Sequence, residues 1–160
     1  MIRPVSPADA ADIAGIYNHF ITDTTVSFET EPLSVDGMRA RIVSLAGSFP
    51  YLVWIEGDRV VAYCYAHPWK ERAAYSHTWE TTIYIDPRWQ GRGIGSRLMD
   101  GLIAECRSRG AYVLIACITA ENAGSIAFHR ALGFRQVSHF DGVGEKFGRR
   151  LDVVDMQFDL

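Results

Sequence analysis

The sequence lacks the features that mark several special classes of protein. It has three cysteines, Cys64, Cys106 and Cys117, and neither their odd number nor their wide spacing fits a disulfide framework or a zinc site. The longest apolar run, residues 111–118, is far shorter than the ~20 residues that a membrane-spanning helix needs. The first residues carry no apolar leader for export. We therefore expect a cytoplasmic protein with reduced thiols and no membrane partner.

Positive charge is also scarce. Sixteen Lys and Arg residues are outnumbered by nineteen Asp and Glu residues, which gives a formal net charge of −3 at pH 7. Because non-specific nucleic-acid binding depends on a basic surface, this balance argues against a nucleic-acid partner. The remaining composition, 48% hydrophobic and 22% charged, is that of an ordinary globular protein. With no repeat or linker, the chain is expected to form one domain, residues 1–160, that needs no disulfide or structural metal.

Hydrophobic periodicity predicts the secondary structure. Apolar residues at helical spacing predict helices over about 7–20, 35–45, 94–106 and 125–132. Apolar and β-branched runs predict strands over 2–5, 51–55, 59–66, 78–85, 113–118, 136–140 and 153–158, with a brief extended piece around 26–28. Short links between 51 and 85 indicate an antiparallel meander, and the helix after residue 85 indicates a parallel crossover. The predicted fold is an α/β (α+β) domain with a mixed, mostly antiparallel central sheet, helices on both faces and one βαβ unit.

A glycine-rich turn joins the strand that ends at Ile85 to the helix that begins near Ile94. Its three glycines let the backbone approach a ligand, and the helix start directs free N–H groups and a positive dipole end toward it. Arg88 and Arg92 add positive charge. The turn therefore predicts a cradle for an anion such as a pyrophosphate, the alternative being a glycine turn without a ligand. A Walker loop is excluded because no Gly-Lys-Ser/Thr follows, and a dinucleotide-binding fold is disfavoured because no acidic residue ends the next strand.

The turn also carries a resemblance to a known family. Gln90-Gly91-Arg92-Gly93-Ile94-Gly95 resembles the Q/R-x-x-G-x-G/A acyl-CoA loop of the GNAT N-acetyltransferases, and the order of elements resembles that fold over nearly the whole chain. Five further segments resemble the phosphinothricin and methionine sulfoximine acetyltransferase group: 25–32, 69–75, 80–85, 122–134 and 144–148. One departure is Arg150, where many members of the group carry Trp. The resemblance implies a homodimeric enzyme that transfers an acetyl group from acetyl-CoA to the amino group of a small amino-acid analogue.

The resemblance also implies which residues hold acetyl-CoA. These cofactor-binding candidates lie at the end of the strand, in the glycine turn and at the start of the late helix: Ile83, Ile85, Arg88, Gln90, Gly91, Arg92, Gly93, Ile94, Gly95, Ser96, Asn122 and Ser125. From the residues alone, Asn122 is equally consistent with a helix-start Asn that contacts no ligand. No metal ion is predicted, because His19, His67, His77 and His139 show no ligand spacing.

Two residues are candidates for catalysis. The alternation of side chains along a strand places Glu80 on the same face as Thr82 and Tyr84. From the residues alone, it is a solvent-facing carboxylate without a catalytic role. The resemblance instead implies a general base for the amine, acting directly or through water, and partial burial would raise its pKa toward a useful range. His129 by itself fits a packed or surface residue, whereas the resemblance implies an acid that protonates the departing thiolate as an imidazolium. Without a Cys-His or Ser-His-Asp arrangement, we expect direct transfer in a ternary complex.

The acceptor side is less sharply defined. Lys70 and Arg72 precede the strand of Glu80 and suit a carboxylate or phosphinate, although most such residues are solvated surface. Phe28, Glu29 and Tyr75 are expected to shape the acceptor pocket, and His77 has no assigned role. Two alternatives stay open: a GNAT enzyme for another amine, such as a protein N-terminus, a polyamine or a drug, and a CoA-binding domain without catalysis.

Overall fold

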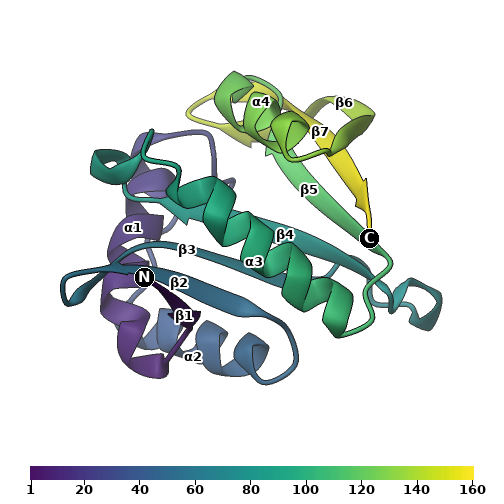
Figure 1. Ribbon diagram of the computed structural model, residues 1–160. Coiled ribbons are helices and arrows are strands. Elements are labelled where there is room, and N and C mark those ends of the chain that lie inside the picture. Colours follow the sequence, from purple (N-terminus) through teal and green to yellow (C-terminus); the bar gives the residue numbers. More distant parts are fainter.

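The apolar runs of the sequence form the strands of one seven-stranded sheet, in the order β1-β2-β3-β4-β5-β7-β6 (Figure 1). In the computed structural model, which describes residues 1–160, the strands are β1 Ile2–Pro4, β2 Tyr51–Glu56, β3 Arg59–Pro68, β4 Thr78–Ile85, β5 Val113–Thr119, β6 Arg135–Lys146 and β7 Arg149–Asp159. Neighbouring strands are antiparallel except β4 and β5, which are parallel. The predicted mixed, mostly antiparallel sheet is confirmed.

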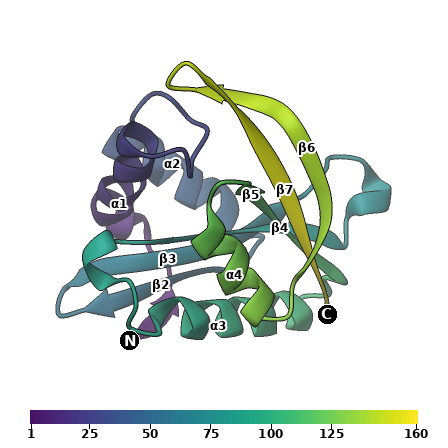
Figure 2. The ribbon, with the colours of Figure 1, turned by 90° about the horizontal axis from the view of Figure 1, so that it is seen from above.

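Four helices cover the two faces of this sheet: α1 Ala10–Asp23, α2 Val35–Ala46, α3 Ile94–Ser108 and α4 Ala123–Ala131. Figure 2 shows α1 and α2 on one side and α3 and α4 on the other. Each face of the sheet has its own hydrophobic core, and alternate side chains of β3 contribute to both. Tyr63 packs in the core under α1 and α2, while Cys64 packs in the core under α3. The predicted helices on both faces are confirmed. No helix is long and apolar enough to cross a membrane.

Local side-chain hydrogen bonds start the first two helices. A short 3-10 turn, Pro7–Asp9, precedes α1, and Ser6 and Asp9 form a reciprocal capping box around it. Ser34 caps α2, because its Oγ accepts the N–H of Gly37 at 3.0 Å. The α1 helix continues to Asp23, three residues beyond the predicted end at Phe20.

The extended piece expected around 26–28 is wrong. This segment forms bends, because hydroxyl groups of the chain itself satisfy its backbone. Thr24 Oγ1 accepts the N–H of Val26 at 3.1 Å, and Ser27 Oγ accepts the N–H of Glu29 at 3.2 Å. The segment therefore crosses the surface as a tight turn instead of adding a strand.

The last two strands are longer than predicted. The prediction ended one strand at Phe140, but β6 runs on through glycines and polar residues to Lys146, and β7 starts at Arg149. As the edge strand of the sheet, β6 needs no apolar alternation, and its pairing with β7 has two register irregularities. The resulting hairpin rises beside the rest of the sheet (Figure 2).

The pairing of β4 with β5 is unusually short. It covers only three residue pairs and ends where Glu80 meets Ile115, although β4 continues to Ile85 and β5 to Thr119. The opposite edge of β4 remains paired with β3 as far as Ile85. Beyond Glu80 the two parallel strands therefore form an open fork, and the edge of β4 that faces β5 has no strand partner.

Candidate active site

The fork opens into a cavity of about 540 Å³. Its walls come from α1, α2, β3, β4, β5, α4 and the segment around residue 28. It brings together seven of the predicted site residues, which are far apart in the sequence: Phe28, Glu29, Glu80, Ile83, Asn122, Ser125 and His129. This convergence of acceptor, catalytic and cofactor candidates in one hollow makes it the candidate active site.

Glu80 is a half-buried carboxylate at the closed end of the fork. It lies on the predicted face, since Trp79 and Ile83 pack toward α3 while Tyr84 packs toward α1. Burial raises its pKa above the ordinary value; His67 opposes this shift and Asp155 adds to it. A carboxylate with a raised pKa is a better proton acceptor for an ammonium group than a free glutamate.

His129 lies on α4 in the opposite wall of the cavity and is 4% exposed. Its Nδ1 lies 2.8 Å from the Ser125 carbonyl oxygen, so this nitrogen carries a proton and donates it. Burial lowers the pKa of His129, and the Ser125 carbonyl only partly opposes the shift. The structure therefore places His129 where the sequence predicts but favours the neutral ring over the imidazolium that the predicted acid role requires.

The glycine turn has the geometry of an anion cradle. Gly91 and Gly93 have φ values of +73° and +74°, which residues with a Cβ rarely adopt. Gly93 caps α3 without a side-chain hydrogen bond, and the N–H groups of Gly93, Ile94 and Gly95 meet no acceptor within the chain. A Cβ on Gly95 would lie 3.0 Å from Ile85 Cδ1 and 3.2 Å from Phe128 Cε2. The helix start is thus held against β4 and α4 with its donors free.

The two arginines of the turn contribute less charge than the sequence suggests. Arg88 forms an ion pair with Asp86 at 2.6 Å, and Asp86 also accepts the Arg88 N–H at 3.0 Å. Arg92 instead lies over the Trp89 ring at 4.5 Å and has no carboxylate partner. Asp86 therefore offsets the positive charge that Arg88 adds to the turn. The cradle relies on backbone N–H groups and Arg92.

The remaining cofactor candidates surround the cradle. Asn122 caps α4, its Oδ1 accepting the Ser125 N–H at 3.1 Å, so this residue starts the helix. Both residues also line the cavity. Gln90 lies beyond the end of β4, with its Nε2 3.4 Å from the Ile85 carbonyl oxygen. Ser96 lies in the first turn of α3.

The structure separates the predicted acceptor residues into two groups. Phe28 and Glu29 line the cavity, but Glu29 is engaged by Arg41 at 2.5 Å and by the Tyr17 hydroxyl. Lys70, Arg72 and Tyr75 lie on the loop between β3 and β4 and do not line it: Lys70 Nζ lies 4.4 Å from the centroid of the Trp69 ring. Within one chain, this loop does not meet Glu80.

The cavity residues that the sequence did not indicate include Tyr17, Arg41 and His67. The signal for His67 was the hairpin register, which pairs it with Glu80 across β3 and β4. Arg41 was harder to predict, because an exposed position on a helix does not indicate that the side chain forms an ion pair with Glu29.

His77 and Arg150 make contacts outside the cavity. His77 donates from Nδ1 to the Gly110 carbonyl at 2.7 Å and stacks on Tyr112. Arg150 donates from Nε to the Gly142 carbonyl at 3.1 Å, within the β6–β7 hairpin. Neither residue lines the cavity.

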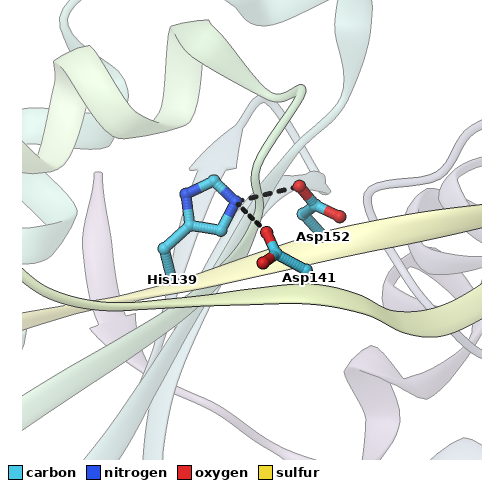
Figure 3. Close-up of side chains that lie close together, drawn as sticks. All are labelled: His139, Asp141 and Asp152. Atoms are coloured by element: carbon cyan, nitrogen blue, oxygen red, sulfur yellow. Dashed lines mark hydrogen bonds and ion pairs between the residues drawn. The ribbon is translucent and has the colours of Figure 1, made fainter.

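His139 gathers two carboxylates on the same hairpin (Figure 3). Its Nε2 lies 2.9 Å from Asp152 Oδ2 and 3.6 Å from Asp141 Oδ1, and the hydrogen bond to Asp152 raises the pKa of His139. The hairpin register creates this group, which the sequence spacing did not indicate. It lies outside the candidate active site.

The uncapped start of α3 suits an anionic group, and the open strand fork holds a half-buried carboxylate; these two features together suit an acyl-transfer site with an anionic cofactor. The chain matches the acetyltransferase (GNAT) family over residues 13–134. It belongs to this family and is an acetyltransferase. The resemblance inferred from the sequence is confirmed.

Similar proteins support a narrower group. The chain is 37% identical to the L-amino acid N-acyltransferase MnaT of Escherichia coli, over 99% of this chain and 93% of that protein. It is 36% identical to an L-methionine sulfoximine/L-methionine sulfone acetyltransferase of Salmonella typhimurium, over 99% of this chain and 94% of that protein. A phosphinothricin acetyltransferase of Sinorhizobium meliloti, solved in complex with acetyl-CoA, superposes with a TM-score of 0.96 at 34% identity, covering 100% and 88% of the two chains.

Proposed function

We propose that this acetyltransferase uses acetyl-CoA to acetylate the amino group of a small amino-acid analogue of the phosphinothricin, methionine sulfoximine or methionine sulfone type. The observation that carries the proposal is the position of Glu80, a half-buried carboxylate in the same cavity that reaches the cofactor candidates on α4. Relatives with these substrates in their names, at 36% and 34% identity, support the substrate class.

The residues present suit acetyl-CoA. The free N–H groups of Gly93, Ile94 and Gly95, with Arg92 beside them, would hold the pyrophosphate. The unpartnered edge of β4 from Ile83 to Ile85, with Asn122 and Ser125 across the fork, would hold the pantetheine arm. When bound, acetyl-CoA supplies the acetyl group as an activated thioester.

Acetyl transfer also requires two proton transfers, one from the substrate ammonium group and one to the departing thiolate. Glu80 accepts the proton of the substrate ammonium, directly or through one water, so that the free amine can attack. His129 is close enough to the fork to serve the departing sulfur, but it acts as an acid only in its protonated minor form. Because no enzyme nucleophile lines the fork in a Cys-His or Ser-His-Asp arrangement, transfer is direct within a ternary complex.

The homodimer implied by the resemblance remains part of the proposal. The loop with Lys70, Arg72 and Tyr75 does not reach its own cavity, so these residues can serve an acceptor only in a second copy of the chain. Light scattering measures the oligomeric state, and a monomer at all concentrations would remove these residues from the acceptor site.

The test is thiol release from acetyl-CoA with a panel of acceptors: methionine sulfoximine, methionine sulfone, phosphinothricin, a polyamine and a short peptide with a free N-terminus. We expect activity with at least one of the first three. Activity with the polyamine or the peptide alone would reject the proposed substrate class, and acetyl-CoA binding without any acetylation would reject catalysis.

A variant tests the assigned base. Glu80→Gln should lower kcat by roughly 10²- to 10⁴-fold, the usual worth of general base catalysis, with little change in acetyl-CoA binding. Glu105→Gln is the matched control, because Glu105 lies on the exposed side of α3 with only a surface ion pair to Arg109. Unchanged turnover of Glu80→Gln would remove the base assignment.

A further inference from the structure

The imidazole of His67 faces the Glu80 carboxylate across the β3–β4 hairpin. The two residues are register partners, so their side chains emerge on the same face of the sheet. His67 Nε2 lies 3.7 Å from Glu80 Oε1, and both side chains line the cavity. Their side chains are 30% and 27% exposed, so each has contact with solvent as well as with the other.

A hydrogen bond sets the tautomer of His67. Its Nδ1 lies 3.0 Å from the carbonyl oxygen of Pro68, an atom that only accepts. Nδ1 therefore carries a proton, and Nε2 is the ring nitrogen that faces Glu80. A small closure of the 3.7 Å gap would bring Nε2 and the carboxylate within hydrogen-bond distance, where a proton can pass between them.

The other groups around Glu80 do not offer such a path. Burial raises the pKa of the Tyr65 hydroxyl on β3, so it remains a neutral phenol. Burial also raises the pKa of Cys117 on β5 to about 12, with Glu80 and Asp155 adding to the shift, so it remains a thiol. Asp155 approaches from β7 and raises the pKa of Glu80 by repulsion. His67 thus combines a ring nitrogen that faces Glu80 with contact to solvent.

We propose that His67 relays the proton from Glu80 to solvent after each turnover, which rests on the proposed role of Glu80 as the base. The Glu80 O–H bond breaks as the His67 Nε2–H bond forms, and the ring becomes an imidazolium with its Nδ1–H still bound to Pro68. The imidazolium then gives its Nε2 proton to water or buffer. His67 touches no reacting atom; it acts through Glu80 and returns it to the carboxylate form.

Buffer rescue distinguishes a relay from a structural role. His67→Ala should lower kcat about tenfold in dilute buffer, less than the ~100-fold or greater loss expected for removing the base itself. Added imidazole should restore kcat in this variant and leave the wild type unchanged, with the KM of acetyl-CoA the same in both. His67→Gln keeps the side-chain bulk without a basic nitrogen and should show the same loss. Thermal unfolding of both variants checks that they fold.

A second measurement does not depend on turnover. In ¹⁵N-histidine NMR spectra, His67 should show the Nδ1-protonated tautomer, and Glu80→Gln should change the pH dependence of its ring signals while Glu105→Gln does not. An unchanged kcat in His67→Ala, a loss that imidazole does not restore, or ring signals indifferent to Glu80 would each overturn the relay. If Glu80→Gln loses activity while one of these three results is found, the relay is rejected but Glu80 remains the base. If the wild type is inactive on every acceptor, the proposed function itself is rejected.

Discussion

A methyl group added at Gly144 should disturb the acceptor side of the cavity and leave the donor side intact. Gly144 lies on β6, and an added Cβ would overlap the ring of Phe28, with Cζ at 2.8 Å and Cδ2 at 2.9 Å. Ordinary contact between carbon atoms begins near ~3.5 Å, so Cζ alone must move by about 0.7 Å, and Cε2, which lies closer still, must move further. Phe28 lines the cavity, and the movement therefore changes the shape of the acceptor wall.

The loss of stability in Gly144→Ala depends on how easily the Phe28 ring can move away from the added methyl group. Overpacking a well-filled site costs about 1–3 kcal/mol. Phe28 is 39% exposed, so the ring can swing toward solvent, and the low end of that range applies. For a chain of this length, about 1 kcal/mol lowers Tm by roughly 2–4 °C. If the acceptor loses a similar amount of binding energy, kcat/KM for the acceptor falls by about fivefold.

Two assays check this prediction for Gly144→Ala. Thermal unfolding gives the change in Tm, and steady-state kinetics with each substrate varied separately gives the two KM values. The control is Gly47→Ala, since a Cβ there meets nothing within 4 Å and its φ is an ordinary −73°. A normal acceptor KM despite a lowered Tm would show that Phe28 does not form the acceptor wall. An equal rise in the KM of acetyl-CoA would refute the separation of the two sides.

Three further predictions concern titratable groups. Because burial raises the pKa of Glu80, kcat should fall as the pH drops through this raised value. Deprotonation of the buried Glu80 carboxyl also destabilises the wild-type fold, so the Tm of Glu80→Gln relative to wild type should increase from pH 4 to pH 8. A Tm difference that does not depend on pH would contradict this. His129→Gln should leave the basic limb of the kcat profile unchanged, because the ring is neutral there, and loss of that limb would show that protonated His129 is the acid. Burial would raise the pKa of Asp9, but Arg3 and the Ser6 N–H together lower it. Asp9→Asn should therefore cost about 1–2 kcal/mol above pH 5, or roughly 2–8 °C in Tm, and this cost should shrink as the pH falls and the wild-type carboxylate is protonated.

Local rules predicted much of this fold and part of the site. The two-residue period of β4 was enough to place Glu80 on the face of Tyr84, and Asn122 was recognisable as a helix-start residue from its type alone. The glycine turn was recognisable because Gly91 and Gly93 permit backbone angles that other residues avoid.

What escaped prediction depended on pairs of residues from different elements. Asp86 neutralises Arg88, Arg41 engages Glu29, and His67 faces Glu80 only because of the hairpin register. Charge counting treats each side chain alone and therefore overestimated the cationic character of the turn. The length of β6 was not predicted for a different reason. An edge strand forms its ladder of backbone hydrogen bonds with one neighbouring strand only, and its sequence therefore shows little hydrophobic alternation.

The early end of the β4–β5 ladder has a topological consequence. A continuous sheet is a wall, and its two faces carry separate cores, one under α1 and α2 and the other under α3. Where the ladder stops, residues that point to opposite faces, Glu80 and Ile83, line a single cavity. The fork is therefore a passage through the sheet. With the acceptor entering from the face of α1 and acetyl-CoA along α3 and α4, as proposed, the two reactants would meet within the thickness of the sheet without competing for the same entrance.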